Sequence, residues 1–237
     1  MGRPLAERTV PLPRRRPRSQ GTLSHVAPHP GGLRSLQARL GAELETGSGF
    51  LLVLDFDGTL APIVSRPEAA RLAPAVRKTL ARLAAAPRVG LAILSGRSLP
   101  DLRGRVGLRG ILYGGCHGLE IRAPGLRFRH PQASVVRRRI RAAAAVLNRV
   151  IPEFPGAHLE SKGLALAVHY RGLSPSRRTA LHRWVKRVAA RAALAILPGK
   201  KDWDLVPPGH RGKAKALRLI RECLKSRIRG RPLLTVY

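Results

Sequence analysis

Cysteines, aromatic residues and acids are all scarce in this sequence. The two cysteines, Cys116 and Cys223, lie far apart, which argues against a disulfide framework and against a zinc site. This cysteine usage favours a reducing, cytoplasmic compartment. No apolar run approaches the length that a membrane-spanning helix needs, so we expect no membrane partner.

The acids are far outnumbered by basic residues. The chain has 13 Asp and Glu against 45 Lys and Arg, a net charge of +32. Such a charge would suit nucleic acid or another anionic surface. Aromatic residues make up only 4%, so stacking platforms for bases are scarce, and the arginines are scattered through predicted helices. We therefore favour a compositional bias towards Arg and Ala and do not expect nucleic acid as a partner.

One stretch, residues 50–60 (FLLVLDFDGTL), carries the clearest chemical signal. A short apolar run leads into Asp55, and Asp57 follows two positions later. Such a run is typical of a strand buried on both faces of a parallel sheet. Open α/β sheets place their chemistry at the carboxyl ends of their strands. Gly58 lets the chain turn there, and Thr59 offers a hydroxyl beside the turn.

Two neighbouring carboxylates suit phosphoryl transfer. One ionised carboxylate can attack phosphorus while a protonated neighbour protonates the leaving alcohol. A hard cation such as Mg²⁺ would cancel the repulsion between the attacking carboxylate and the phosphate. A lone D-x-D is more often a simple turn after a strand, but the full run of apolar strand and D-x-D-G-T is much rarer.

Apolar strands and amphipathic helices alternate along the chain. In the first half, strands are predicted over 51–54, 89–94 and 111–113, and helices over 35–44, 74–86 and 99–106. Their order implies right-handed crossovers and a parallel α/β sheet. In the second half, helices are predicted over 133–150, 174–193 and 213–224, and strands over 164–169, 195–197, 203–206 and 232–237.

This pattern predicts a Rossmann-like parallel-sheet core over 35–122 and 207–237, interrupted by an α+β cap over 123–206. Residues 1–34 are rich in Arg, Pro and Gly and poor in acids, so we expect them to be disordered. They lack the apolar centre of a secretory signal. An organelle transit peptide and a wrongly assigned start codon both stay open for this segment.

Ser95 and Lys213 are candidate phosphate ligands. Ser95 follows the predicted strand 89–94 and precedes Gly96 and Arg97, so its hydroxyl and nearby backbone N–H groups could hold a phosphate oxygen. Lys213 opens a helix and could pair with a carboxylate and the phosphate as a compact charge. A helix cap and a solvated surface lysine are the ordinary interpretations of these residues.

Glu160, Lys162 and Arg171 are candidate sugar ligands in the predicted cap. On an extended segment, positions 160 and 162 face the same side, where they could bind sugar hydroxyls. An exposed ion pair explains the spacing equally well. His117 lies at the tip of the third predicted strand, which on such a sheet faces the site, although a histidine in a glycine-rich turn is usually a loop residue.

Together these motifs resemble those of the trehalose-6-phosphate phosphatases, a family of the haloacid dehalogenase-like superfamily. The matching stretches cover roughly residues 50–237 and read LDFDGTLAPI, LAILSGR, YGGCHGLEI, HLESKGLALAVHYR and DLVPPGHRGKAKAL. The fourth is the most telling, because few members of the superfamily share it. The resemblance implies a haloacid dehalogenase-type core closed by a cap, Mg²⁺-dependent hydrolysis of trehalose 6-phosphate in trehalose biosynthesis, and a possible functional link to a trehalose-phosphate synthase.

The resemblance also implies roles for single residues. Asp55 would be the nucleophile that forms an aspartyl-phosphate, and Asp57 the general acid and then the base that activates water. The Asp55 carboxylate and the Asp57 backbone carbonyl would hold Mg²⁺. Ser95 and Lys213, together with Thr59 of the first motif, would complete the catalytic set. The implied sugar-binding residues are Arg97, His117, Glu160, Lys162, Arg171 and Asp204.

Three departures from the family pattern bear on these roles. Cys116 stands where the family usually has Asn, which removes an amide from the sugar side. Asp204 stands where the family usually has Glu, so its reach is one methylene shorter. The chain also ends at Tyr237, one step before the acid-rich loop that completes the family's Mg²⁺ site. We therefore expect this chain to be truncated and weakly active or inactive.

Two alternatives stay open. The chain could act on another sugar phosphate, such as sucrose or mannosyl-glycerate phosphate, because cap residues decide the sugar. It could also be a non-catalytic protein that binds nucleic acid through its arginine-rich surface. Salt-sensitive nucleic-acid binding that survives Asp55→Asn and is lost with residues 1–34 would indicate the second alternative.

Overall fold

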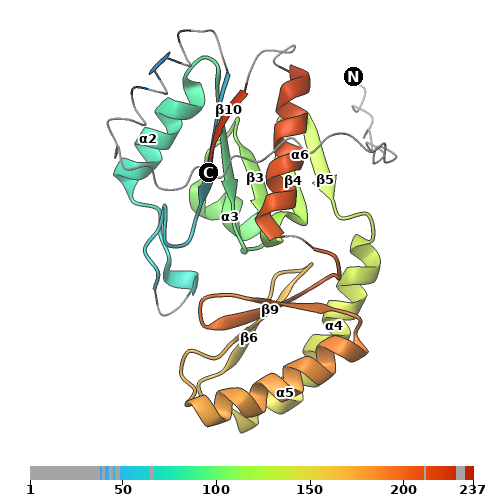
Figure 1. Cartoon of the computed structure of the whole chain (residues 1–237). Helices are drawn as coiled ribbons and strands as arrows, with labels where there is room; N and C mark the ends of the chain where they lie inside the picture. Colours follow the sequence, from blue (N-terminus) through green and yellow to red (C-terminus); the bar gives the residue numbers. More distant parts are fainter. Residues whose placement is uncertain are drawn as a thin grey trace, which may run out of the picture.

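The structure, a computed structural model, describes residues 38, 41–42, 45, 49–64, 67–210, 212–227 and 233–237, with side chains up to residue 222 in the last helix. The disorder expected for residues 1–34 lies outside these residues, as does most of the helix expected over 35–44. The chain forms a core and a cap that face each other (Figure 1). Within the described part, no helix is both long and apolar enough to cross a membrane.

The core is built on a six-stranded sheet in the order β10-β1-β2-β3-β4-β5. Its parallel strands are β1 (Gly49–Asp55), β2 (Val89–Leu94), β3 (Leu112–Gly115) and β10 (Leu233–Val236). An antiparallel hairpin of β4 (Glu120–Ala123) and β5 (Leu126–Arg129) extends one edge. The mostly parallel sheet confirms the predicted α/β class.

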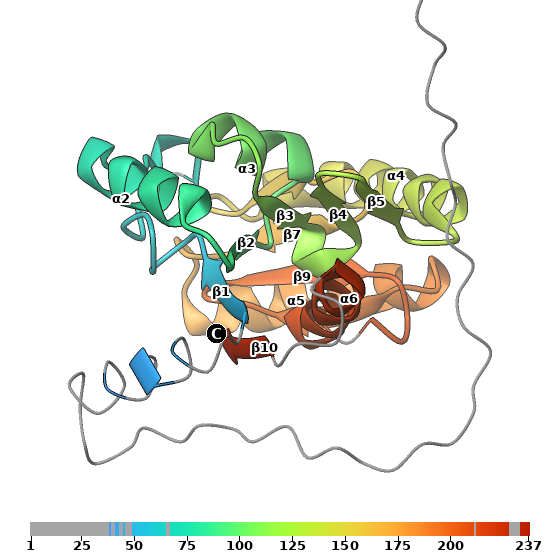
Figure 2. The same cartoon turned by 90° about the horizontal axis from the view of Figure 1, so that it is seen from above.

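Helices cover both faces of this sheet, so its strands are buried on two sides. Figure 2 shows α2 (Pro74–Ala85) and α3 (Leu99–Val106) on one face and α6 (Gly212–Arg227) on the other. Local sequence fixes the ends of α3: the Ser98 hydroxyl accepts a hydrogen bond of 3.3 Å from the Asp101 N–H, and Gly107 ends the helix in the left-handed conformation.

The cap has an antiparallel sheet in the order β6-β7-β9-β8. Its strands are β6 (His158–Ser161), β7 (Leu166–His169), β8 (Ala195–Pro198) and β9 (Asp202–Val206). Two helices, α4 (Ala133–Val150) and α5 (Pro175–Arg191), pack on the face away from the core (Figure 1). Their buried residues recur at helical spacing, as at Val136, Ile140 and Leu147 in α4. The polar face of the cap sheet is therefore turned towards the core.

The hairpin β4–β5 marks the main difference from the sequence prediction. The core sheet continues to Arg129, beyond residue 122 where we expected the core to end. Both strands have four residues and alternate charged and apolar side chains, so they lack the long apolar run that predicts a buried strand. The short strand β6 also escapes prediction.

Helix α6 approaches the tip of β3 unusually closely. The short 3-10 helix η2 (Cys116–Gly118) follows β3, and α6 packs on it through Ala216, which is buried. A Cβ added at Gly118 would lie 2.3 Å from the Ala216 Cβ, and the φ of Gly118 is +94°. Only glycine meets both conditions, and the contact lies one turn from the start of α6.

Candidate functional site

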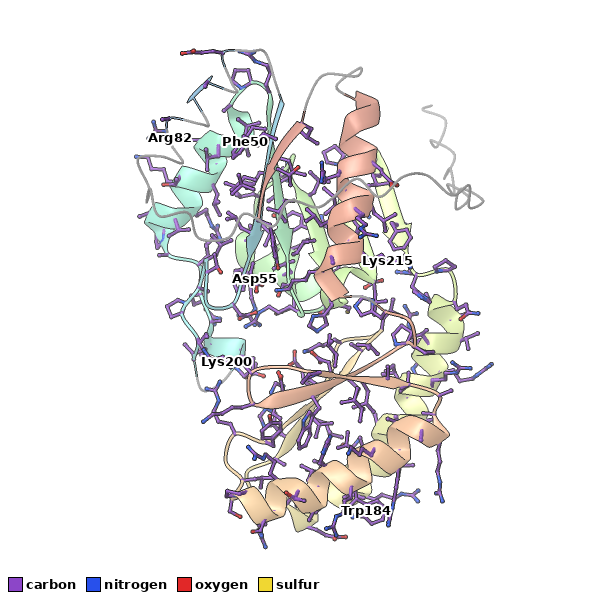
Figure 3. All side chains as sticks on the ribbon, in the orientation of Figure 1. Phe50, Asp55, Arg82, Trp184, Lys200 and Lys215 are labelled. Atoms are coloured by element: carbon purple, nitrogen blue, oxygen red, sulfur yellow. The ribbon has the colours of Figure 1, made fainter. Side chains whose placement is uncertain are left out.

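The site begins where β1 ends, on the side of the core that faces the cap (Figure 3). Oδ1 of Asp55 accepts a hydrogen bond of 2.8 Å from the Phe56 N–H. The Nζ of Lys213, in the first turn of α6, donates to Oδ2 of the same carboxylate. The fold thus joins two predicted site residues that are 158 positions apart in the chain. Thr59 lies exposed in the turn that follows Asp57.

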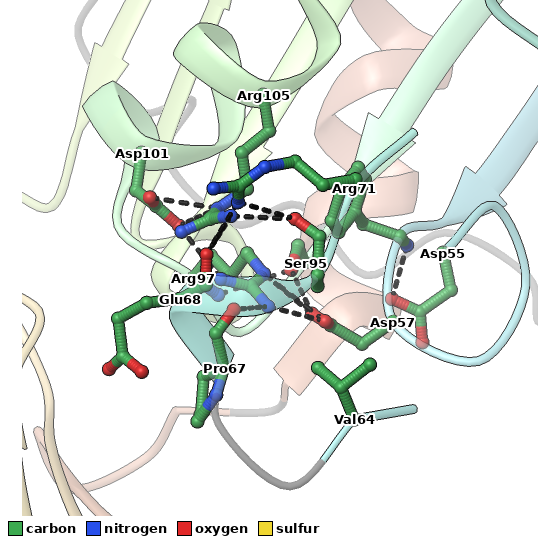
Figure 4. A network of polar contacts seen from close by, with 12 residues as sticks. Asp55, Asp57, Val64, Pro67, Glu68, Arg71, Ser95, Arg97, Asp101 and Arg105 are labelled. Carbon is green, nitrogen blue, oxygen red and sulfur yellow. Dashed lines mark hydrogen bonds and ion pairs between the residues drawn. The ribbon is translucent and has the colours of Figure 1, made fainter. Parts of the chain in front are cut away.

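Ser95 and Arg97 converge on the second aspartate from the end of β2. The buried Ser95 Oγ lies 3.4 Å from Oδ2 of Asp57 and accepts a bond of 3.2 Å from the Arg97 N–H. The Arg97 guanidinium holds both oxygens of Asp57, with Nη2 at 2.7 Å from Oδ1 and Nε at 2.9 Å from Oδ2 (Figure 4). This bidentate pairing is the strongest geometry available to Arg and a carboxylate.

Asp101 and Arg105 in α3 hold Arg97 in place, and we call Arg97, Asp101 and Arg105 the arginine clamp (Figure 4). Asp101 accepts a bond of 3.0 Å from Arg97 Nη1 and bonds of 2.9 and 2.8 Å from Arg105 Nε. Arg105 in turn donates to the carbonyls of Ala70, at 2.7 Å, and Glu68. The clamp therefore ties the end of β2 and α3 to the segment that carries the short helix η1 (Pro67–Ala69).

The clamp favours the charged forms of Arg97 and Asp101. Burial by itself lowers the pKa of Arg97, but the hydrogen bonds and charges of Asp57 and Asp101 outweigh it and raise that pKa overall. Burial by itself raises the pKa of Asp101, and the hydrogen bonds from Arg105 and Arg97 lower it overall. The Arg97 side chain is 7% exposed and is directed at Asp57. Its predicted contact with sugar stays a prediction.

A second cluster joins core and cap: His117, Lys162 and Asp204, which we call the core–cap triad. His117 Nε2 lies 2.7 Å from Oδ2 of Asp204, and Lys162 Nζ lies 2.8 Å from Oδ1. Beside it, the Cys116 thiol donates to the Lys162 carbonyl at 3.0 Å. Burial raises the pKa of that thiol to about 12, so Cys116 acts as a neutral donor.

Two members of the triad, Lys162 and Asp204, are buried, and each favours the charged form of the other. Lys162 and Asp204 are 7% and 3% exposed. Burial by itself raises the pKa of Asp204, but the hydrogen bond from His117 and the charge of Lys162 lower it to about 2. Burial by itself lowers the pKa of Lys162, and the charges of Asp204 and Glu160 raise it overall. The fold therefore brings three predicted sugar ligands together, bound to one another.

The two remaining cap candidates, Glu160 and Arg171, have hydrogen-bond partners outside the triad. Glu160 Oε2 is 3.0 Å from His169 Nε2, and the ring of His169 stacks on that of His158 with centroids 4.4 Å apart. Burial by itself raises the pKa of Glu160, but its bond with His169 lowers it overall. Arg171 is exposed, and its Nη1 donates to the Val64 carbonyl in the core at 3.1 Å.

Sequence reasoning missed Asp101 and Arg105. The available signal was their spacing, because positions 97, 101 and 105 are each four residues apart, which places successive side chains on one face of a helix. In the sequence His169 is one residue of the stretch HLESKGLALAVHYR, and its bond with Glu160 requires the pairing of β6 with β7.

The described residues offer few ligands for a divalent cation. No group of three or more His, Cys, Asp or Glu side chains converges among them as a metal site. The Asp55 carboxylate and the Asp57 backbone carbonyl remain as oxygen donors. Mg²⁺ commonly keeps several waters and takes one or two carboxylates plus substrate phosphate, so this small set fits Mg²⁺ better than a cation that needs a protein cage.

Paired aspartates at the end of a central parallel strand, beneath an α+β cap, define a haloacid dehalogenase-type fold. The fold is shared with a trehalose-6-phosphate phosphatase related protein (TM-score 0.65, 24% identity, 73% of each chain). It is also shared with the C-terminal domain of the Candida albicans trehalose-6-phosphate phosphatase (TM-score 0.65, 23% identity, 76% of this chain and 64% of that one).

Sequence comparison then specifies the family. The family described as trehalose-phosphatase matches residues 53–236, so the chain belongs to the trehalose-phosphatase family. The trehalose-phosphate phosphatase of Mycobacterium tuberculosis H37Rv is 40% identical over 164 residues, which are 69% of this chain and 41% of that protein. That of Mycobacterium ulcerans is 34% identical over 214 residues, 90% of this chain and 53% of that protein. The chain therefore spans about two fifths to one half of these relatives' length.

Proposed function

We propose that the chain hydrolyses trehalose 6-phosphate in two phosphoryl-transfer steps. The observation that carries the proposal is the meeting of Lys213 with Asp55, and of Ser95 and Arg97 with Asp57, beneath a polar cap face. Membership of the trehalose-phosphatase family supports trehalose 6-phosphate as the substrate. A functional link to a trehalose-phosphate synthase stays a prediction.

In the first step a carboxylate oxygen of Asp55 attacks phosphorus. The bond between phosphorus and the sugar oxygen breaks, and Asp57 gives its proton to the departing alkoxide. Lys213 keeps the Asp55 carboxylate oriented and adds a positive charge beside the incoming phosphoryl group. The products are an aspartyl-phosphate and free trehalose.

In the second step Asp57, now a carboxylate, takes a proton from water. The water oxygen attacks phosphorus, the bond to Asp55 breaks, and inorganic phosphate leaves. Arg97 suits this step, because its bidentate grip holds both oxygens of the Asp57 carboxylate in a fixed position. Mg²⁺ bound by the Asp55 carboxylate and the Asp57 carbonyl would neutralise charge on the phosphoryl oxygens.

The cap would recognise the sugar. Glu160 and Arg171 place polar groups on the side of the cap nearest the core. In the core–cap triad, Lys162 and Asp204 already satisfy each other, so a sugar hydroxyl would have to replace one of these bonds. We therefore expect Glu160 to contribute more to substrate affinity than Lys162.

The proposal is tested by measuring phosphate release in the presence of Mg²⁺ from each of three substrates: trehalose 6-phosphate, sucrose 6-phosphate and glucose 6-phosphate. Calorimetric titration of the same three compounds into Asp55→Asn adds a measurement that needs no turnover. Preference for trehalose 6-phosphate in either measurement supports the assignment. Glu160→Gln should raise KM, or the dissociation constant, by about tenfold, whereas the exposed control Glu153→Gln should not.

Two results would count against the proposal. Absence of both turnover and binding of trehalose 6-phosphate in the presence of Mg²⁺ would refute it. Stronger binding or turnover of another sugar phosphate would leave the proposed role of Asp55 unchanged but would assign a different substrate.

A further inference from the structure

Three polar side chains form a row across the cap sheet. His158, His169 and Asp202 lie directly opposite one another on β6, β7 and β9. Residues paired in this way in antiparallel strands share one face of the sheet. Helices α4 and α5 cover the other face, so the row lies on the face turned towards the core. Glu160 is two positions along β6 from His158 and therefore lies on this face too.

The ring of His169 is held on three sides. Nε2 lies 3.0 Å from Oε2 of Glu160, and Nδ1 lies 3.8 Å from Oδ2 of Asp202. The His158 ring stacks on it with centroids 4.4 Å apart and planes inclined by 16°. Both nitrogens and one face of the ring are thus in contact with neighbours, which restricts its rotation.

Exposure separates the part that Glu160 can play from that of His169. The His169 side chain is 13% exposed and the Glu160 side chain 29%, so a ligand beneath the cap reaches the glutamate more easily. Burial by itself raises the pKa of Glu160, but the bond with His169 and the charge of Lys162 lower it overall. The ionised carboxylate can only accept hydrogen bonds, so Nε2 of His169 is the donor.

We propose that His169 is a positioning residue for sugar binding: it holds the Glu160 carboxylate in one orientation, from which Oε1 accepts a hydrogen bond from a sugar hydroxyl. A glutamate side chain loses much rotamer freedom when it is fixed. Where the fold has already fixed it, ligand binding carries less of that loss and is tighter. His158 and Asp202 support the effect by fixing the His169 ring. The inference rests on the proposed function, because it deepens the role given there to Glu160.

Binding is measured in Asp55→Asn, which lacks the proposed nucleophile. Trehalose 6-phosphate, sucrose 6-phosphate and glucose 6-phosphate are titrated separately by calorimetry in the presence of Mg²⁺. His169→Phe keeps a flat ring for the stack on His158 and removes both nitrogens, whereas His169→Gln keeps an N–H donor. Glu160→Ala, alone and combined with His169→Phe, removes the group that is positioned.

The matched control is another histidine of the cap. His182 in α5 stacks on the ring of Trp203 with centroids 4.5 Å apart, on the side of the cap away from the core. His182→Phe therefore makes the same chemical change to a stacked histidine without altering the face that carries Glu160.

For the sugar phosphate that binds most tightly, His169→Phe should raise the dissociation constant about tenfold, as expected for losing one hydrogen bond to a charged group. His169→Gln should stay within about threefold of the parent, and His182→Phe should equal it. In Glu160→Ala, the further change to His169→Phe should have little effect, because a residue that acts through Glu160 has no effect without it.

Unchanged binding in His169→Phe would overturn the proposal. An equal further loss in Glu160→Ala would do the same, since it would show that His169 acts independently of Glu160. An equal loss in His182→Phe, or no recovery in His169→Gln, would also contradict it. If His169→Phe does not fold, His158→Ala at the exposed start of β6 takes its place, with an expected loss of about threefold that requires Glu160.

Failure of the proposed function has a different signature. If none of the three sugar phosphates binds Asp55→Asn, the proposed function fails and this inference falls with it. If one of them binds, and binds the His169 variants equally well, only the inference about His169 fails.

Discussion

Lys213 and Asp55 form an ion pair although α6 and β1 lie at opposite ends of the chain. The lysine side chain is 22% exposed and the aspartate side chain 32%, so both can reach a ligand from the cap side. The ammonium group of Lys213 therefore lies against the carboxylate that we propose as the nucleophile.

Replacing Lys213 by Gln should lower kcat/KM for phosphate release by about 10²–10³, the usual loss for one charged donor at a developing phosphoryl charge. Lys215→Gln, two residues along the same helix and exposed (Figure 3), is the matched control and should keep the parent rate. Equal rates in both variants would show that Lys213 has no part in catalysis.

The arginine clamp should assist protonation of the leaving group by holding the Asp57 carboxyl group in position. Asp101→Asn loosens Arg97 without touching Asp57, so kcat/KM should fall about tenfold for a sugar phosphate. The effect should be much smaller for 4-nitrophenyl phosphate, whose leaving group needs no proton. Arg109→Gln, exposed after α3, serves as control. An equal loss on both substrates would indicate general misfolding and contradict the positioning role.

Removing a single member of the core–cap triad should lower the free energy of unfolding. Asp204→Ala leaves the buried ammonium of Lys162 without its closest partner, which should cost about 3–5 kcal/mol. A fall in melting temperature of about 10 °C is the corresponding signal. Burial and the charge of Asp204 raise the pKa of neighbouring Asp202, so Asp202→Asn removes an unfavourable charge and should not destabilise. Similar losses in both variants would contradict this account.

His210 should make stability depend on pH. Burial, with help from the charges of His117, His130 and Lys215, lowers its pKa from 6.5 to about 4. The unfolded chain therefore binds the proton first, and stability present above pH 6.5 is lost as pH falls towards about 4. Since His210 is only partly buried, we expect a loss of about 1–2 kcal/mol.

Urea unfolding at pH 7.5 and 4.5 measures this loss. His210→Gln cannot take up the proton, so the difference in unfolding free energy between the two pH values should shrink by that amount. An unchanged difference would show that His210 titrates alike in the folded and unfolded chains.

Much of the fold could be predicted because several helices and strands are each specified by residues within their own segment. The apolar run before Asp55, the Ser98 cap of α3 and the heptad-like spacing in α4 each specify an element locally. The bounds of β2, α3 and α4 agree with the prediction for this reason. The hairpin β4–β5 could not be predicted, because its apolar residues are buried only when α6, from the other end of the chain, packs against that face.

The site was only partly predictable for a similar reason. Sequence motifs name Asp55, Ser95 and Lys213, and the fold places the first two at neighbouring strand ends and Lys213 in the first turn of α6. That Arg97 turns to Asp57, and that Asp204 bonds both His117 and Lys162, depends on distances between elements that no motif encodes.

Gly118 illustrates how a residue without a side chain can influence chemistry from a distance. A single methyl group at this position would collide with Ala216 and push the start of α6 outward. The ammonium group of Lys213 would move with it, away from Asp55. The position of the Lys213 charge beside Asp55 therefore depends on an empty space the size of one carbon atom, one helical turn further along α6.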